Sequence, residues 1–193
     1  PLPPPPMPPP CSSELDTSRL SAIDTAIATW PRNARGLLRT YKQLSSNEPL
    51  CNPTDVYYGT ATDFCFRHDL YDTSLAAIYL TKRGNHADAS ALLTGIEQWY
   101  NDPIVTNGLA LASDGVWIAP YGYYKPLDYA EDIGNNAWAG IAFAVSAIHT
   151  GNSTRLGVAH RILDVIVATA SGCDDAFQGY RARPFHDENN NAY

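Results

Sequence analysis

Two stretches of the chain contain the same Gly-Asn dipeptide between two apolar segments, and this repeat limits the fold more than any other feature. In each, a segment rich in alanine and aliphatic residues ends in Gly-Asn, at Gly84-Asn85 and at Gly151-Asn152. A second amphipathic segment follows at once. Glycine directly after a helix favours the left-handed conformation that ends it. Because so short a connection makes two helices antiparallel neighbours, the sequence predicts two helical hairpins.

The first hairpin is expected over LYDTSLAAIYLTKRGNHADASALLTGIEQWY, residues 70–100. Asp72 is the predicted N-cap of its first helix. Spacings of three and four predict one apolar face on that helix, made of Leu75, Ile78 and Tyr79. The second helix is predicted from about Ala87 to Tyr100, with its apolar positions at Leu92, Leu93, Ile96, Trp99 and Tyr100.

The second hairpin is expected over residues 131–172, with one helix ending at Gly151 and another running from Ser153 or Thr154 to Gly172. Between the hairpins lies LASDGVWIAPYGYYKPLDYAED, in which apolar residues alternate with turn residues. This pattern predicts a long loop or a short β-hairpin, and long ordered loops in helical domains are usually functional. The overall expectation is an all-α fold of antiparallel hairpins.

The first residues, PLPPPPMPPPC, exclude helix and central strand, because each proline fixes φ and removes a backbone donor. We expect residues 1–13 to form a polyproline II arm, followed by a helical domain over 14–193. A helix is predicted from Arg19 to Trp30, where Pro31 ends it, and a shorter one from Ala34 to Leu44.

The net charge of −7 argues against nucleic acid or an anionic membrane as a partner, because phosphate binding needs clustered Lys and Arg. No apolar run reaches the roughly 18 residues that a membrane span needs. The longest candidate, Ala137 to Ile148, is instead interpreted as a buried helix. Neither the cysteines nor the histidines have metal-ligand spacing, so we predict no metal and no cofactor.

The four cysteines are Cys11, Cys51, Cys65 and Cys173. An even count in a lysine-poor chain favours two disulfides in an oxidising compartment, with buried free thiols as the alternative. Three pairings are possible, of which Cys51–Cys65 with Cys11–Cys173 is favoured. Asn152-Ser153-Thr154 is an N-glycosylation sequon, whereas the one at Asn52 is blocked by proline. These features favour a secreted, extracellular glycoprotein.

The segments YDTSLAAIYLTKRGNHADASALL, DGVWI and GNNAWAGIAFAVSAIHTGN resemble the repeats of (α/α)6-toroid glycoside hydrolases and related sugar-active proteins. The resemblance covers roughly residues 66–193. A complete toroid needs about twice this length. The resemblance therefore implies about half a ring: a fragment, a half-toroid or a degenerate relative. The proline arm resembles hydroxyproline-rich glycoproteins of walls and matrices.

In such toroids the inner helices point their N-termini at a rim that holds a sugar groove. The resemblance implies that the rim residues here are Asp72, Glu131, Asp132, Asn135 and Asn136. Glycoside hydrolysis needs two carboxyl groups about 5 to 9.5 Å apart. Glu131 and Asp132 are adjacent, so Asp72 with one of them is the candidate catalytic pair. The alternative is that Asp72 only caps its helix.

Aromatic side chains near this rim could stack on sugar rings, and these are Trp117, Tyr121, Tyr123, Tyr124 and Trp138. Core packing is the alternative for each. Two functions follow. The first is an extracellular structural glycoprotein that assembles with other copies of itself into a filament or matrix, since a half-ring exposes apolar helix faces. The second is a carbohydrate-active enzyme, a glycoside hydrolase, or a sugar-binding domain with glycans as partners.

Overall fold

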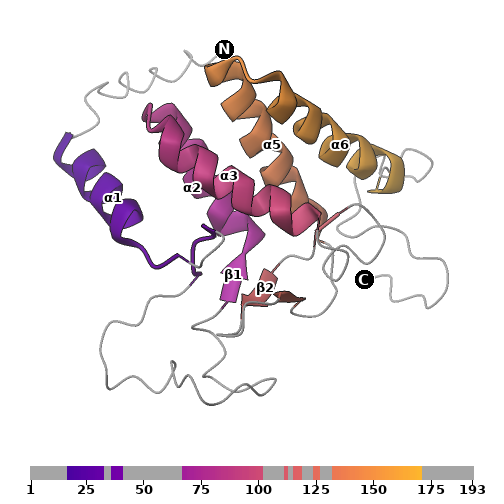
Figure 1. The fold of residues 1–193 in the computed structure, drawn as a ribbon, viewed down its shortest axis with the longest axis horizontal. Helices are drawn as coiled ribbons and strands as arrows, with labels where there is room; N and C mark the ends of the chain where they lie inside the picture. The colour runs from indigo at the N-terminus through magenta and orange to yellow at the C-terminus, as the bar shows by residue number, and fades with distance from the viewer. Residues whose placement is uncertain are drawn as a thin grey trace, which may run out of the picture. The chain divides into compact units, whose positions relative to one another are not determined.

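The structure is a computed structural model, and it describes residues 17–32, 36–40, 67–101, 111–112, 115–118, 124–126 and 132–170. This part is mostly helical, as the sequence predicts (Figure 1). The chain divides into two compact units, residues 1–30 and 31–193. The predicted polyproline arm lies outside the described residues.

The first unit contains one described helix, α1 (Thr17–Thr29), which confirms the helix predicted from Arg19. Two of its threonines return a side-chain hydrogen bond to the preceding turn: Thr25 Oγ1 donates to the carbonyl of Ser21 at 2.9 Å, and Thr29 Oγ1 to that of Thr25 at 2.8 Å. None of its residues is buried. The proline that follows cannot extend the helix.

The helix predicted over residues 34–44 is wrong in its described part, residues 36–40. There the backbone is not helical, and Leu38 pairs with Arg32 in an isolated antiparallel bridge. Gly36 has φ +84°, a left-handed conformation that reverses the chain between these two residues. Leu37 and Leu38 are both buried in this non-helical segment.

The first hairpin consists of α2 (Leu70–Lys82) and α3 (His86–Tyr100), close to the predicted bounds. Gly84 ends α2 with φ +79°. Asn85 then caps α3: its Oδ1 accepts from the backbone N–H of Asp88 at 3.3 Å, and its Nδ2 donates to the Asp88 carboxylate at 2.8 Å. The turn thus satisfies the end of α2 with backbone N–H groups of residues 83–85 and the start of α3 with the Asn85 side chain.

The start of α2 corrects the predicted role of Asp72. Because strand β1 (Arg67–Asp69) runs directly into the helix, Asp69 occupies the N-cap position in an extended conformation, and Asp72 lies in the first turn. The buried side of α2 also differs from the predicted apolar face: it holds Leu70, Thr73, Ser74, Ala76, Ala77, Leu80 and Thr81. The predicted face, Leu75, Ile78 and Tyr79, is only half-buried.

The second hairpin consists of α5 (Ile133–Thr150) and α6 (Ser153–Ala170). Asp132 caps α5 by accepting from the N–H of Asn135 at 2.9 Å. Gly151 ends the helix with φ +68°, which confirms the predicted stop. Asn152 then caps α6 by accepting from the N–H of Arg155 at 3.2 Å. The two hairpins therefore use the same turn chemistry.

A small sheet lies at the N-terminal end of α2. Strand β2 (Gly115–Ile118) pairs antiparallel with β1 on one side and with β3 (Tyr124–Pro126) on the other. The β2–β3 pair confirms the β-hairpin predicted between the helical hairpins. The third strand, β1, was not predicted, because three residues are too few for a periodic pattern.

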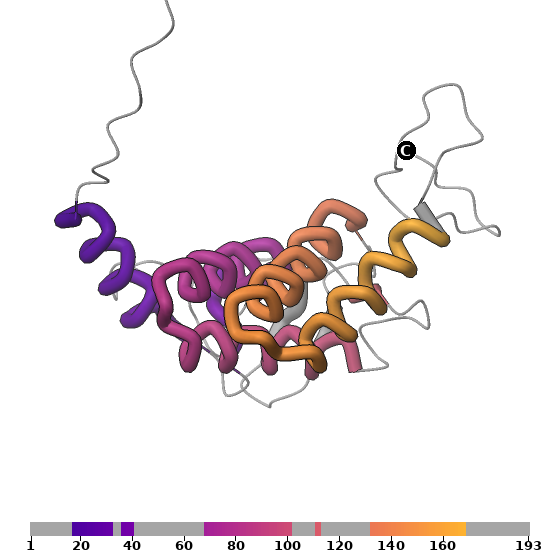
Figure 2. The backbone as a smooth tube through the Cα atoms, turned by 90° about the horizontal axis from the view of Figure 1, so that it is seen from above, coloured from indigo at the N-terminus to yellow at the C-terminus, as the bar shows by residue number. Residues whose placement is uncertain are grey.

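The hairpins pack through their first helices. Helix α2 lies against α3 and α5, and α5 lies against α6, as the tube in Figure 2 shows. Fully buried side chains from all four helices form the core, among them Leu70, Trp99, Ile96, Phe143 and Ile162. Arg155 of α6 links three helices, because its guanidinium donates to Ser146 of α5 at 2.5 Å and to Ser90 of α3.

Candidate functional site

The two described carboxylates of the predicted rim lie at the N-terminal ends of α2 and α5. Asp132 is half-buried, and one of its carboxylate oxygens accepts the capping bond from Asn135. Asp72 is half-buried in the first turn of α2, where its charge complements the helix dipole. Glu131 lies outside the described residues. Capping and the helix dipole thus account for both described acids.

Asn136, another predicted rim residue, is fully buried. Its Oδ1 accepts from the Tyr100 hydroxyl at 2.5 Å and from the N–H of Ala112 at 2.9 Å. Its Nδ2 donates to the carbonyls of Ala112 and Asp132, both at 2.9 Å. The amide therefore uses its full hydrogen-bonding capacity inside the protein and has none left for a ligand.

Tyr100 completes this buried cluster from the C-terminal end of α3. Burial raises the pKa of its phenol above the ordinary value of 10.0, and the opposing effect of the Arg161 charge is smaller. The hydroxyl therefore stays protonated as a donor to Asn136. This cluster joins the end of the first hairpin to the start of the second, which is a structural role.

The aromatic residues predicted to stack on sugars lie in different parts of the structure. Trp138 is 38% exposed on α5. Trp117 and Tyr124 lie on strands β2 and β3, while Tyr121 and Tyr123 lie outside the described residues. The structure also brings in Tyr71, which the sequence analysis missed. Tyr71 is 39% exposed, and its ring contacts the Trp138 ring edge to face, with centroids 5.9 Å apart and an interplanar angle of 79°.

Tyr71 could have been found from its spacing. It precedes Leu75 and Ile78 by four and seven residues, which places all three on one face of a helix. That face is the less buried one on α2. Tyr71 and Trp138 therefore form an exposed aromatic pair at the N-terminal ends of two adjacent helices, which pack against each other.

The outward face of α5 is the largest departure from expectation. Residues Ala137 to Ile148 are helical as predicted, but they are not buried on every side. Ile141 is 39% exposed and Ile148 is 77% exposed. With Trp138 they belong to one stripe, which we name the α5 seam: Gly134, Trp138, Ile141, Val145 and Ile148.

The α5 seam lies on a helix that contains no Asp, Glu, Lys or Arg from Ile133 to Thr150. Helix α6 differs, because its exposed positions include charged Arg161 and Asp164. A helix that is apolar all round is ordinarily buried on all sides. The signal in the sequence was this absence of charge, which predicts that both faces of α5 are covered by protein.

The sequon residue Asn152 is exposed at the turn between α5 and α6. Its capping bond uses Oδ1 as the acceptor, whereas a glycan is attached to Nδ2. Capping and glycosylation of Asn152 are therefore chemically compatible. The four cysteines all lie outside the described residues, so their pairing stays a prediction.

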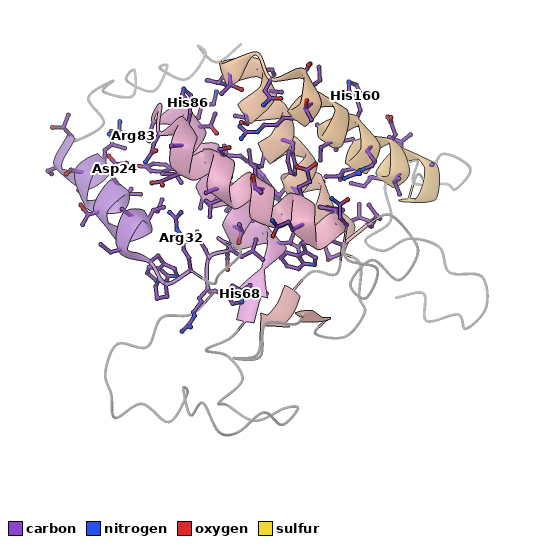
Figure 3. The ribbon with its side chains drawn as sticks, viewed as in Figure 1. Asp24, Arg32, His68, Arg83, His86 and His160 are labelled. Atoms are coloured by element: carbon purple, nitrogen blue, oxygen red, sulfur yellow. The ribbon has the colours of Figure 1, made fainter. Side chains whose placement is uncertain are left out.

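Within the described part, no group of three or more His, Cys, Asp or Glu side chains could hold a metal ion. Figure 3 shows this for three histidines, because His68, His86 and His160 stand apart on β1, α3 and α6. None of the helices described is long and apolar enough to cross a bilayer. Across the described residues, the feature best suited to an interaction is the α5 seam with its aromatic end. No family model, curated protein or solved structure matches the chain.

Proposed function

We propose that this chain is a secreted, extracellular structural glycoprotein that assembles with other copies of itself through the α5 seam. One observation carries the proposal: a helix without a charged residue exposes Trp138, Ile141 and Ile148 to solvent. Exposed apolar surface of this kind marks interaction sites. Binding to a partner would remove that surface from water, at roughly 25 cal/mol for each Å².

The packing of the hairpins supports a toroid-type architecture for the proposed subunit. In an (α/α) toroid the first helix of each hairpin lies beside the first helix of the next. Here α2 packs against α5, and α3 and α6 are their hairpin partners. A partial ring would leave apolar helix faces open, which is consistent with the exposure of the α5 seam.

The extracellular and glycosylated character rests on the four cysteines and the exposed sequon. Expression through a secretory pathway should add one N-glycan at Asn152. Intact mass before and after enzymatic deglycosylation measures it, with Asn152→Gln as the control that abolishes the shift. An unmodified Asn152 in secreted wild-type protein would contradict the glycoprotein part of the proposal.

Sedimentation velocity of the whole chain over a wide concentration range tests the assembly. We expect the average mass to rise with concentration. Added salt should strengthen the effect, because it screens repulsion between copies that each carry a net charge of −7. Ile148→Glu should weaken association at least tenfold, because a buried unpaired carboxylate is costly.

The matched control is Thr94→Glu, which adds the same charge at an exposed position of α3. It should leave association unchanged. A chain that stays monomeric at every concentration and salt level would overturn the proposal. Equal effects of the two variants would show that net charge, and not the α5 seam, governs association.

Sugar binding is a second candidate, favoured by the exposed Tyr71–Trp138 pair. Aromatic rings with a polar handle suit the apolar faces of sugars. Titration with glucan and mannan oligosaccharides should quench tryptophan fluorescence, and Tyr71→Ala should reduce the affinity. Release of reducing sugar in the same mixture would favour the glycoside hydrolase alternative. No quenching with either glycan would exclude this candidate for those sugars.

A further inference from the structure

The spacing of the α5 seam is that of a helix-pairing surface. Its positions 134, 138, 141, 145 and 148 alternate by four and three residues, the a/d pattern of a coiled-coil seam. At 3.6 residues per turn they lie within an arc of about 80°. On one side the seam is flanked by Ala137 and Ala144. Small flanking residues allow a second helix to approach closely.

We infer that the α5 seam pairs antiparallel with the α5 seam of a second copy, across a two-fold axis near Ile141. This inference rests on the proposed function and specifies its contact. A two-fold contact uses the same surface patch on both copies. The same patch can face itself, because α5 has no Asp, Glu, Lys or Arg, and an antiparallel pair keeps its basic residue, His149, at opposite ends of the two copies.

The side-chain sizes along the seam favour the antiparallel direction. An antiparallel pair centred on Ile141 places Gly134 opposite Ile148 of the second copy, and Trp138 beside Ala144 and Val145. The most exposed seam residue then meets the smallest, and the largest ring meets a small side chain. A parallel pair would instead oppose tryptophan to tryptophan and glycine to glycine, leaving overpacked and empty layers along the seam.

The available area indicates a reversible dimer. Trp138, Ile141, Ile148 and the adjacent Tyr71 are 38%, 39%, 77% and 39% exposed. At about 150–250 Å² for a large side chain, they offer roughly 400 Å² per copy. Two copies would bury roughly 800 Å² in total through these side chains, which is below the roughly 1,200 Å² of a stable interface and in the range of weak, transient contacts. We therefore expect the dimer to dissociate on dilution.

Photo-crosslinking of the full chain tests the pairing. A benzophenone amino acid replaces Ile148, and an equimolar mixture of ¹⁴N- and ¹⁵N-labelled protein is irradiated. Crosslinked peptides of mixed isotope report contacts between copies. The antiparallel pair predicts that position 148 of one copy captures residues near 134–138 of the other. A second variant with the probe at Ile141 should capture residues near 138–145.

Each outcome decides the inference. Capture of residues near 145–150 by the probe at 148 would establish a parallel pair and overturn the antiparallel one. Mixed-isotope crosslinks only outside α5 would overturn both the antiparallel pair and assembly through the α5 seam, whereas a parallel pair would leave assembly through the seam intact. A monomer without mixed-isotope crosslinks, at concentrations where sedimentation should detect a dimer, would overturn both. The two probe positions are exposed in the folded protein, so a folding defect in one variant leaves the other as the test.

Discussion

The two helical hairpins have the same turns and different outward faces. In each, a left-handed glycine ends the first helix and an asparagine Oδ1 caps the second. The less buried face of α2 carries a charge at its C-terminal end, Lys82, whereas the seam of α5 carries none. Turn chemistry therefore accounts for the shared hairpin shape. The two hairpins differ in their outward faces, because that of α2 carries a charged side chain and that of α5 is uncharged.

The largest expected change in the free energy of unfolding comes from Asn136, which joins the two hairpins. Asn136→Ala removes four hydrogen bonds and leaves the Tyr100 hydroxyl and both backbone groups of Ala112 unpaired. At about 1–3 kcal/mol for each buried unsatisfied group, we expect the free energy of unfolding to fall by about 3–5 kcal/mol. Urea denaturation followed by circular dichroism measures it. The neighbouring Asn135→Ala should change it by less than about 0.5 kcal/mol, and equal losses would contradict a special role for Asn136.

The next largest loss of stability is expected where α5 packs against α6 in the second hairpin. In Gly140→Ala, the added Cβ would meet the Leu163 side chain at 2.8 Å, so either that side chain or the two helices would have to shift. We expect a loss of about 1–3 kcal/mol. Gly157→Ala is the matched control on α6, because nothing lies within 4 Å of the added atom. This control should stabilise the protein by up to about 1 kcal/mol.

Thermal unfolding of both variants measures the difference. A neutral Gly140→Ala would show that Leu163 moves aside at no cost, and the second hairpin would then be less tightly packed than described. A destabilising Gly157→Ala would contradict the open surface at that position.

The buried tyrosine predicts how stability depends on alkaline pH. Because its folded pKa is raised, the folded protein keeps the Tyr100 proton at pH values where the unfolded chain loses it. The resulting contribution of Tyr100 to the free energy of unfolding is fully present below pH 10.0. It is lost as the pH rises above that value, by about 1.4 kcal/mol for each pH unit.

Tyr100→Phe should remove this pH dependence and cost about 1 kcal/mol at neutral pH, through the lost bond to Asn136. The measurement is the free energy of unfolding of both proteins between pH 8 and 11. Parallel curves for wild type and variant would show that another group governs the alkaline loss.

The smallest loss of stability is expected for alanine substitutions at the glycines of the two turns, which can be compared directly. Gly84 and Gly151 have φ +79° and +68°, and in both cases nothing lies within 4 Å of an added Cβ. Alanine at either site should cost about 1 kcal/mol, because only the backbone conformation is strained. Thermal denaturation of the two variants should give equal shifts. Clearly unequal shifts would show that the two turns are not equivalent.

Much of the helical part was predictable because its signals are local. Gly84 and Gly151 mark helix ends whatever surrounds them, and the residues after them cap the next helix. Where the chain meets distant residues, prediction was less accurate. A helix was expected over residues 34–44, but the bridge between Arg32 and Leu38 and the left-handed Gly36 are incompatible with a helix in its described part. Similarly, β1 precedes α2 directly, and this moved the helix start away from Asp72.

The candidate site was less predictable than the fold. The aromatic Trp138 was identified from its residue type, but its partner Tyr71 comes from another hairpin, and only packing of α2 on α5 brings them together. Asn136 looked like a rim residue by its position, and the structure buries it. Composition reveals which side chains are able to bind, whereas exposure depends on how helices pack.

By itself, the sequence determined the two hairpins and the absence of charge along α5, since glycine stops, asparagine caps and helical periodicity act within a few residues. Only the tertiary structure decided which faces are covered. Burial depends on contacts between residues far apart in the chain, such as Tyr100 with Asn136 and Arg155 with Ser90. The packing of α2 and α6 on α5 covers part of that helix and leaves the seam exposed.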